Sequence, residues 1–189
     1  MFDGHGGTDS SIYVKENIQD IVQNSSYWRT YTTSGRSVVN HLVEMFLDVY
    51  KELDFRLRSN QSQSLGQDCS GTTAVCALIT PNYIICANVG DSRCVIAFQG
   101  DKSRPLTFDH KPEVAEERRR IEAAGGLVTN GRIDNNISVS RSLGDFQFKN
   151  DHSLPPDQQK VSLFTHFEFE CVHRGARGML SSKTPILCL

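Results

Sequence analysis

The sequence lacks long apolar runs, a marked charge imbalance and a leader-like start. Its longest apolar runs, such as AVCALI and YIICA, have the length of β-strands and fall far short of a membrane span. The 20 basic and 22 acidic side chains give a formal net charge of −2, so neither nucleic acid nor an anionic membrane is expected as a partner. No basic, then apolar, then small-residue arrangement opens the chain, and no secretory signal is predicted.

Paired cysteine and histidine motifs are also missing. The six cysteines include no C-x-x-C pair, and the six histidines include no H-x-x-x-H pair. This pattern disfavours a disulfide framework and a structural zinc site. We expect reduced, mostly buried thiols in a cytoplasmic or nuclear protein.

The size and composition are those of a globular domain, with 189 residues, 38% hydrophobic and 22% charged. Apolar residues at helical spacing predict one helix from about residue 8 to 23 and a second from about 36 to 57. The polar stretch NSSYWRTYTTSGRS joins them and is interpreted as a connection.

The second half of the chain is rich in β-like segments. GTTAVCALIT, NYIICANVG and SRCVIAFQG are separated by turn residues, which predicts an antiparallel meander. LTFD, LVTN, GRID and ISVS are expected as short strands. KPEVAEERRRIEAAGG predicts a helix, because proline stands at its start and glycines at its end. Its expected inner face consists of Val114, Arg118, Ile121 and Ala124. Together these elements indicate an α+β fold.

The stretch FDGHGG combines residue types suited to phosphate chemistry. Asp3 would place a carboxylate at a sheet edge and Gly4 would free a backbone carbonyl, both ligands that Mg²⁺ and Mn²⁺ prefer. His5, with a pKa near neutrality, is suited to donate a proton to a leaving group. The alternative is that D-G and G-G are ordinary turn residues.

Three further stretches carry candidate site residues. Asp91 in NVGDSR is either another cation ligand or a solvated residue of a hairpin turn. Thr73 in SGTTAV is either part of the site or a polar strand edge. Arg141 and Asp145 in SVSRSLGDFQFK are either functional or a salt-bridged connection.

The order and spacing of five blocks resemble the metal-dependent (PPM, type 2C) protein serine/threonine phosphatases. The blocks are FDGHGG, SGTTAVCALI, ANVGDSRCVIA, LTFDHKPEVAEERRRIEAAGG and GRIDNNISVSRSLGDFQFK. The resemblance implies a partial αββα sandwich, two antiparallel sheets flanked by helices, over residues 1–161. Residues 162–189 are expected to form a divergent tail.

The resemblance also implies roles for the candidate residues. Asp3 corresponds to the carboxylate that bridges two Mg²⁺ or Mn²⁺ ions, and Gly4 to the residue whose carbonyl binds one of them. His5 corresponds to the general acid. Asp91 corresponds to a ligand of a weaker third metal site, and Thr73 lies near it.

Arg141 and Asp145 belong, by resemblance, beside the mobile flap at the cleft, with a role in substrate access. The implied reaction is metal-dependent hydrolysis of phosphoserine and phosphothreonine in proteins, by an enzyme that is a monomer.

Strands and metal ligands that the family carries before FDGHGG and after residue 161 have no counterpart in this sequence. We therefore expect a catalytic domain truncated at both ends, with weakened metal binding and little or no turnover. The alternative is a non-catalytic splice or gene-model fragment that acts as a phosphoprotein-binding or regulatory module.

Overall fold

The structure is a computed structural model that describes residues 1–34, 39–60, 68–80, 83–98, 102–163, 171–173 and 186–188. The helices are α1 (Asp9–Asn24), α2 (Ser26–Ser34), α3 (Val39–Ser59) and α5 (Ala115–Ala123). The longer strands are β3 (Ala74–Ile79), β4 (Tyr83–Val89), β5 (Cys94–Phe98) and β6 (Lys102–Pro105). The short strands are β1 (Gly4–His5), β2 (Gly71–Thr72), β7 (Val128–Thr129), β8 (Arg132–Ile133), β9 (Leu143–Gly144), β10 (Cys171–His173) and β11 (Ile186–Cys188).

Helices α1 and α3 confirm the two long helices predicted from apolar spacing. The polar stretch between them was predicted to be a connection, and this prediction is wrong because α2 occupies most of it. The Ser25 hydroxyl accepts a hydrogen bond from the backbone N–H of Trp28 at 3.1 Å, which stabilises the first turn of α2. Tyr27, Trp28 and Tyr31 pack against the main core cluster, and this packing outweighs the polar composition of the segment.

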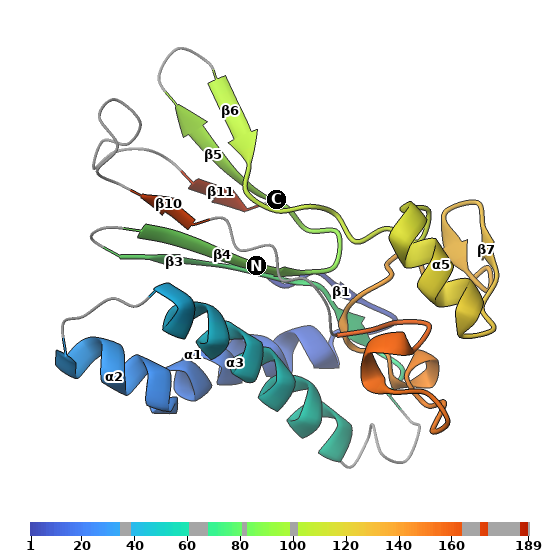
Figure 1. The fold of residues 1–189 in the computed structure, drawn as a ribbon. Coiled ribbons are helices and arrows are strands. Elements are labelled where there is room, and N and C mark those ends of the chain that lie inside the picture. Colours follow the sequence, from blue (N-terminus) through green and yellow to red (C-terminus); the bar gives the residue numbers. More distant parts are fainter. Residues whose placement is uncertain are drawn as a thin grey trace.

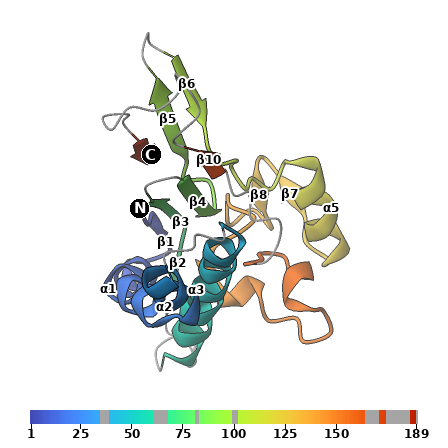
Figure 2. The same ribbon diagram turned by 60° about the vertical axis from the view of Figure 1, so that its left-hand side comes forward.

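Two of the three three-stranded sheets form stacked layers with helices α1, α2 and α3, while α5 lies to the side of these layers (Figures 1 and 2). One sheet has the order β10-β4-β3 and the other β11-β5-β6, and every ladder in them is antiparallel. Apolar residues of α1 and α3 pack with those of β3 and β4 in one core cluster. Residues of β3 and β4 pack with those of β5 in a second cluster. This layered arrangement confirms the predicted α+β fold with antiparallel sheets flanked by helices.

The predicted three-stranded meander is only partly correct. β3 and β4 pair as expected, but β5 pairs with β6 and β11 in the second sheet. Gly90 has a φ of 101°, a conformation that favours glycine. The turn that contains Gly90 therefore leads the chain from one sheet to the other, and Asp91 follows directly.

Two short predicted strands are misplaced. The strand of the 102–109 region is β6, which ends at Pro105 just before LTFD. Leu106 is fully buried there, so burial produced the apolar signal that was interpreted as a strand. ISVS forms no regular strand, and Ile137 makes only an isolated bridge to Ile133.

Helix α5 lies within the predicted segment but is shorter, since it begins at Ala115, three residues after Pro112, and ends at Ala123, and it buries a different face. Ile121 is buried as expected, whereas Val114 is exposed. Glu117 is buried in place of an apolar residue, since two arginines neutralise its charge, as described below. The apolar pattern alone does not reveal this face.

The predicted tail lies largely outside the described residues. Besides residues 162 and 163, two of its segments are described, and both pair with the sheets: β10 with β4 and β11 with β5, both antiparallel. The boundary at residues 161 and 162 stays a prediction. Among the described helices, none combines the length and apolar character that a membrane crossing requires.

Candidate active site

The first residues of the chain lie antiparallel to the segment that contains β2 and β3. The Thr73 N–H donates to the Asp3 carbonyl at 3.0 Å, and the Asp3 N–H donates to Thr73 Oγ1 at 3.1 Å. β1 continues this pairing, with His5 opposite Gly71. Asp3 is exposed and His5 partly exposed as a result, and both line one cavity.

The turn after Gly90 brings Asp91 to the same cavity. The neighbouring Ser92 hydroxyl is 2.7 Å from the Thr73 hydroxyl, which joins this turn to the start of β3. The Asp91 carboxylate is engaged in an ion pair, because Lys111 donates from Nζ to Asp91 Oδ2. No local pattern predicts this pair, since Lys111 stands 20 residues away in a loop.

Asp145 lies beside His5 although 140 residues separate them in the chain. Its backbone N–H donates to the Ser70 carbonyl at 3.2 Å. Its Oδ2 lies 2.7 Å from His5 Nε2 and also accepts a hydrogen bond from the Ser142 hydroxyl. The side chain of Asp145 is only 1% exposed, against 31% for His5. The carboxylate is therefore a buried partner of the imidazole.

The surroundings of His5 favour its charged form. Burial by itself lowers the pKa of the imidazole. The hydrogen bond and negative charge of Asp145, together with the charges of Asp3 and Asp91, outweigh burial. The net result is a pKa raised above the ordinary value of 6.5.

The cavity formed by these segments has a volume of about 300 Å³. Five of the seven residues predicted from the sequence line it: Asp3, His5, Thr73, Asp91 and Asp145. Gly4 and Arg141 are not among its lining residues. The cavity also contains Arg132 of β8, an exposed cation that sequence reasoning missed because nothing in GRID sets it apart from a surface arginine.

Arg141 is buried in an ion network below the cavity. Its Nε donates to Glu117 Oε2 at 2.9 Å, and its Nη2 donates to Glu117 Oε1. Arg120 Nη2 donates to the same carboxylate at 2.8 Å. The salt-bridged connection weighed as the alternative for Arg141 is therefore present, while its role in substrate access stays a prediction.

This network contributes to the pKa values of buried Glu117 and partly buried His110. Burial raises the pKa of Glu117, but the hydrogen bond from Arg141 and the charges of both arginines outweigh it and lower the pKa to about 2. Burial lowers the pKa of His110 to about 4, and the positive charges of Arg141 and Arg120 act in the same direction. The Gly90 N–H donates to His110 Nδ1 at 3.1 Å, which requires an unprotonated nitrogen there.

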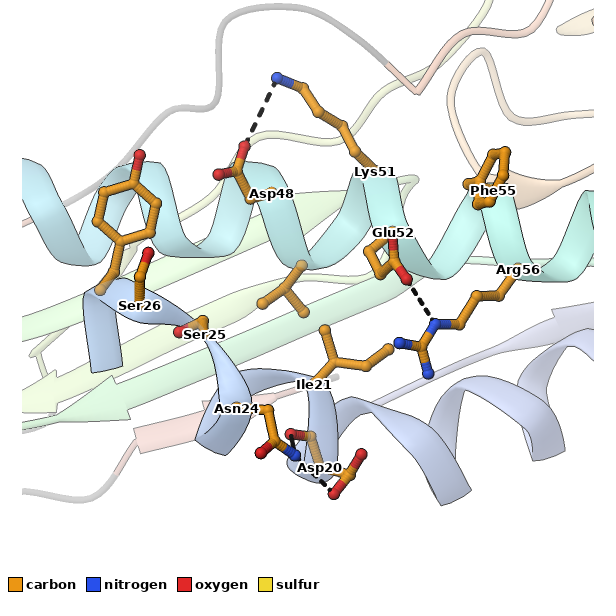
Figure 3. A pocket seen from close by; sticks show the side chains of 12 residues that line it. Asp20, Ile21, Asn24, Ser25, Ser26, Asp48, Lys51, Glu52, Phe55 and Arg56 are labelled. Carbon is orange, nitrogen blue, oxygen red and sulfur yellow. Dashed lines mark hydrogen bonds and ion pairs between the residues drawn. The ribbon is translucent and has the colours of Figure 1, made fainter. Parts of the chain in front are cut away.

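A second and larger cavity, of about 710 Å³, lies between α1, α2 and α3 (Figure 3). Four of its charged side chains form two ion pairs, and Asp20 accepts a hydrogen bond from the Asn24 side chain. Lys51 contacts Asp48 at 3.9 Å, and Arg56 donates to Glu52 at 2.6 Å. None of the residues predicted to carry chemistry lines this cavity, so volume alone does not identify the site.

The donors at the smaller cavity suit a hydrated divalent cation. Asp3 and Asp91 are carboxylates, and Mg²⁺ is commonly bound by one or two carboxylates together with water. Within the described ranges, no group of three or more His, Cys, Asp or Glu side chains is placed to hold a metal ion.

Comparison with known proteins gives a consistent result. Residues 1–170 match the family model of protein phosphatase 2C. Protein phosphatase 2C homolog 2 of Schizosaccharomyces pombe is 38% identical over 166 residues, which cover 87% of this chain and 41% of that protein. The Saccharomyces cerevisiae protein of the same name is 35% identical over 164 residues, covering 86% of this chain and 33% of that protein.

Solved structures agree in fold. A serine-threonine phosphatase 2C from Toxoplasma gondii has a TM-score of 0.72 and 22% identity, covering 97% of this chain and 63% of that one. A sex-determining protein of Caenorhabditis elegans has a TM-score of 0.70 and 25% identity, covering 99% of this chain and 41% of that one. The chain spans about two fifths of the length of the S. pombe relative.

Proposed function

Because the chain belongs to the protein phosphatase 2C family, we propose that its smaller cavity hydrolyses phosphoserine and phosphothreonine in proteins with the help of Mg²⁺ or Mn²⁺. The observation that carries this proposal is the convergence of Asp3, Asp91 and His5 on one cavity of about 300 Å³. Two carboxylates beside an imidazole provide the residue types needed for metal-assisted ester hydrolysis.

Two residues at the cavity are proposed to act on the substrate, one in anion binding and one in proton transfer. Arg132 is a cation at the cavity and is suited to attract the phosphate group. His5 is proposed to protonate the departing serine or threonine oxygen, since its surroundings favour the protonated form.

Asp3 is proposed as the main carboxylate ligand of the cation, assisted by the Gly4 carbonyl, with Asp91 as a weaker ligand and Thr73 beside it. A bound Mg²⁺ or Mn²⁺ ion supplies a nucleophile at neutral pH by lowering the pKa of a bound water. Among the described residues, no ion pair neutralises the charge of Asp3, so this carboxylate is available to a cation. Lys111 already neutralises Asp91, so Asp91 attracts a cation less strongly. We therefore propose weak cation binding and slow turnover.

The test is phosphate release from a phosphothreonine peptide in the presence of Mn²⁺, with the full chain. We expect slow release by the wild type, and at least a tenfold loss in Asp3→Ala, because the main ligand is gone. Asp134→Asn is the matched control, since this acid pairs with Lys160 away from the cavity and its removal should leave release unchanged. Equal release by the wild type and Asp3→Ala would overturn the proposal.

A binding measurement with the same peptide separates the two candidate functions. Peptide binding without release in the wild type would support a non-catalytic phosphoprotein-binding module. Activity as a monomer in the cytoplasm or nucleus remains part of the proposal, and it rests on the family resemblance and on cysteine usage.

A further inference from the structure

We propose that Asp145 is the positioning residue of His5: its buried carboxylate fixes the imidazole through Nε2 and leaves Nδ1 as the nitrogen that transfers the proton. This inference deepens the proposed function and rests on it for the identity of the reaction. It gives Asp145 a role different from substrate access, which the family resemblance implied for its segment.

The first argument is the geometry of the contact. His5 Nε2 and Asp145 Oδ2 are 2.7 Å apart, a distance typical of a charge-assisted hydrogen bond. Because an ionised carboxylate only accepts hydrogen bonds, the proton must lie on Nε2. No partner of Nδ1 is found among the described residues, so this nitrogen remains for the substrate. A group that fixes one ring nitrogen thereby determines the function of the other.

The second argument is the burial of the carboxylate. Asp145 is 1% exposed, and a buried carboxylate is tolerated only when it is paired and hydrogen-bonded. Within the described part of the chain, His5 is the ion-pair partner found for it. Ser142 donates a further hydrogen bond to the same oxygen. A residue so enclosed acts on His5, not on an approaching substrate.

The third argument is that the backbone of β2 approaches the Asp145 carboxylate closely at Gly71. A Cβ atom added to Gly71 would lie 2.1 Å from Asp145 Oδ2, so a larger residue at that place in β2 would displace the carboxylate from its present position. Asp145 itself has a φ of 54°, in the left-handed region. Such strain persists when neighbouring contacts impose it.

The loop that carries Asp145 is held from the helical layer as well. Asp54 of α3 accepts hydrogen bonds at 2.9 Å from the Gly144 N–H and from Lys149 Nζ. Lys149 Nζ also donates to the Ser142 carbonyl at 2.9 Å. The carboxylate therefore sits on a fixed frame, which positioning of an imidazole requires.

The test is proton–nitrogen NMR of the ¹⁵N-labelled full chain at neutral pH and low temperature, without metal or substrate. We expect a downfield ring-proton resonance of His5 Nε2–H in the wild type, identified by its absence in His5→Gln. Asp145→Ala should lose it, and Asp145→Asn should shift it upfield, because a neutral amide is a weaker acceptor than a carboxylate. Because asparagine has nearly the same side-chain volume as aspartate, Asp145→Asn tests the loss of the charge without leaving a cavity that could disturb folding.

Two controls keep the acceptor in place. Ser142→Ala removes the second hydrogen bond to Asp145 and should retain the resonance. Asp134→Asn, away from His5, should leave it unchanged. Absence of the resonance in the wild type, or its persistence unshifted in both Asp145 variants, would overturn the inference.

Kinetics give a second readout. Asp145→Asn should lower kcat by about tenfold or more and leave KM unchanged, because His5 acts on the leaving group. A loss confined to KM would contradict the proposed role. Failure of the phosphatase proposal is distinguishable, since it shows as absent phosphate release in the wild type whatever the NMR result.

Discussion

At the scale of single residues, small changes in side-chain size and charge decide what the cavity can do. Gly71 gives space to the Asp145 carboxylate, and that carboxylate in turn contacts His5. Gly90 allows the turn that presents Asp91, and its N–H donates to His110. Protonation of the partly buried His110 ring is therefore linked to the turn at the cavity.

The first prediction concerns His110 and pH. Its pKa is lowered from 6.5 to about 4 in the folded chain, so the unfolded chain binds the extra proton between these values. The contribution to stability is complete above pH 6.5 and is lost as the pH falls toward about 4. The loss is on the order of 3 kcal/mol at most.

His110→Asn should reduce this pH dependence, because the asparagine oxygen accepts the Gly90 N–H without titrating. Urea unfolding of wild type and variant between pH 4 and 7 measures the difference in the free energy of unfolding. His152→Asn, at an exposed histidine, controls for loss of an imidazole. A variant with the same slope as the wild type would contradict the assignment.

At the scale of elements, α5 is held by charge as well as by the apolar packing of Ile121. Glu117 accepts hydrogen bonds from Arg141 and Arg120, and Arg120 also donates to the Ser140 carbonyl at 2.8 Å. These contacts join the helix to the segment that precedes Asp145. The helix is thus coupled to the loop that contacts His5.

The second prediction tests this coupling. Glu117→Gln leaves two arginines without their buried counter-charge, and it should lower the free energy of unfolding by about 3 kcal/mol. Glu122→Gln on the same helix removes an ion pair with Arg118 in which both side chains are nearly half exposed, and should change stability by less than about 1 kcal/mol. Chemical denaturation measures both values.

Equal effects of the two substitutions would show that burial of the Glu117 pair contributes nothing to the free energy of unfolding.

The stabilisation by Glu117 also depends on pH with a known sign. Because the pKa of Glu117 is lowered from 4.5 to about 2, its stabilisation is present above pH 4.5 and is lost as the pH falls toward 2.

At the scale of the whole molecule, the two sheets and the helical layer bring separate segments to one cavity. Residues from β1, the β2–β3 region, the turn after β4 and the loop after β9 meet there. A cation that binds at this junction binds only the folded chain, and it therefore raises global stability.

The third prediction follows from this linkage. Mn²⁺ at ten times its dissociation constant should stabilise the fold by about 1.4 kcal/mol, and Asp3→Asn should abolish most of the rise in melting temperature. Lys111→Gln releases the Asp91 carboxylate from its ion pair and should give a larger Mn²⁺-induced rise than the wild type. Each rise is measured from the variant's own metal-free value.

Lys160→Gln is the matched control, since it breaks the exposed pair with Asp134 outside the cavity. Its Mn²⁺-induced rise should equal that of the wild type. A smaller rise in Lys111→Gln than in the wild type would show that Asp91 does not take part in cation binding.

The sequence by itself determined the features that depend on neighbours in the chain. Apolar spacing predicts α1 and α3, and alternating β-rich runs predict β3 and β4, because each pattern matches the period of its own element. Asp3, His5 and Asp91 lie in short glycine-containing motifs that, taken singly, also suit ordinary turns; the order and spacing of the five blocks make them candidates, and their roles stay predictions.

Only the tertiary structure decided the contacts between distant segments. The transfer of β5 to a second sheet, the pairing of Lys111 with Asp91 and the arrival of Arg132 at the cavity carry no local signal. The contact of Asp145 with His5 spans 140 residues. It exists because the pairing of β1 with β2, and of β2 with β9, brings the two side chains to the same place.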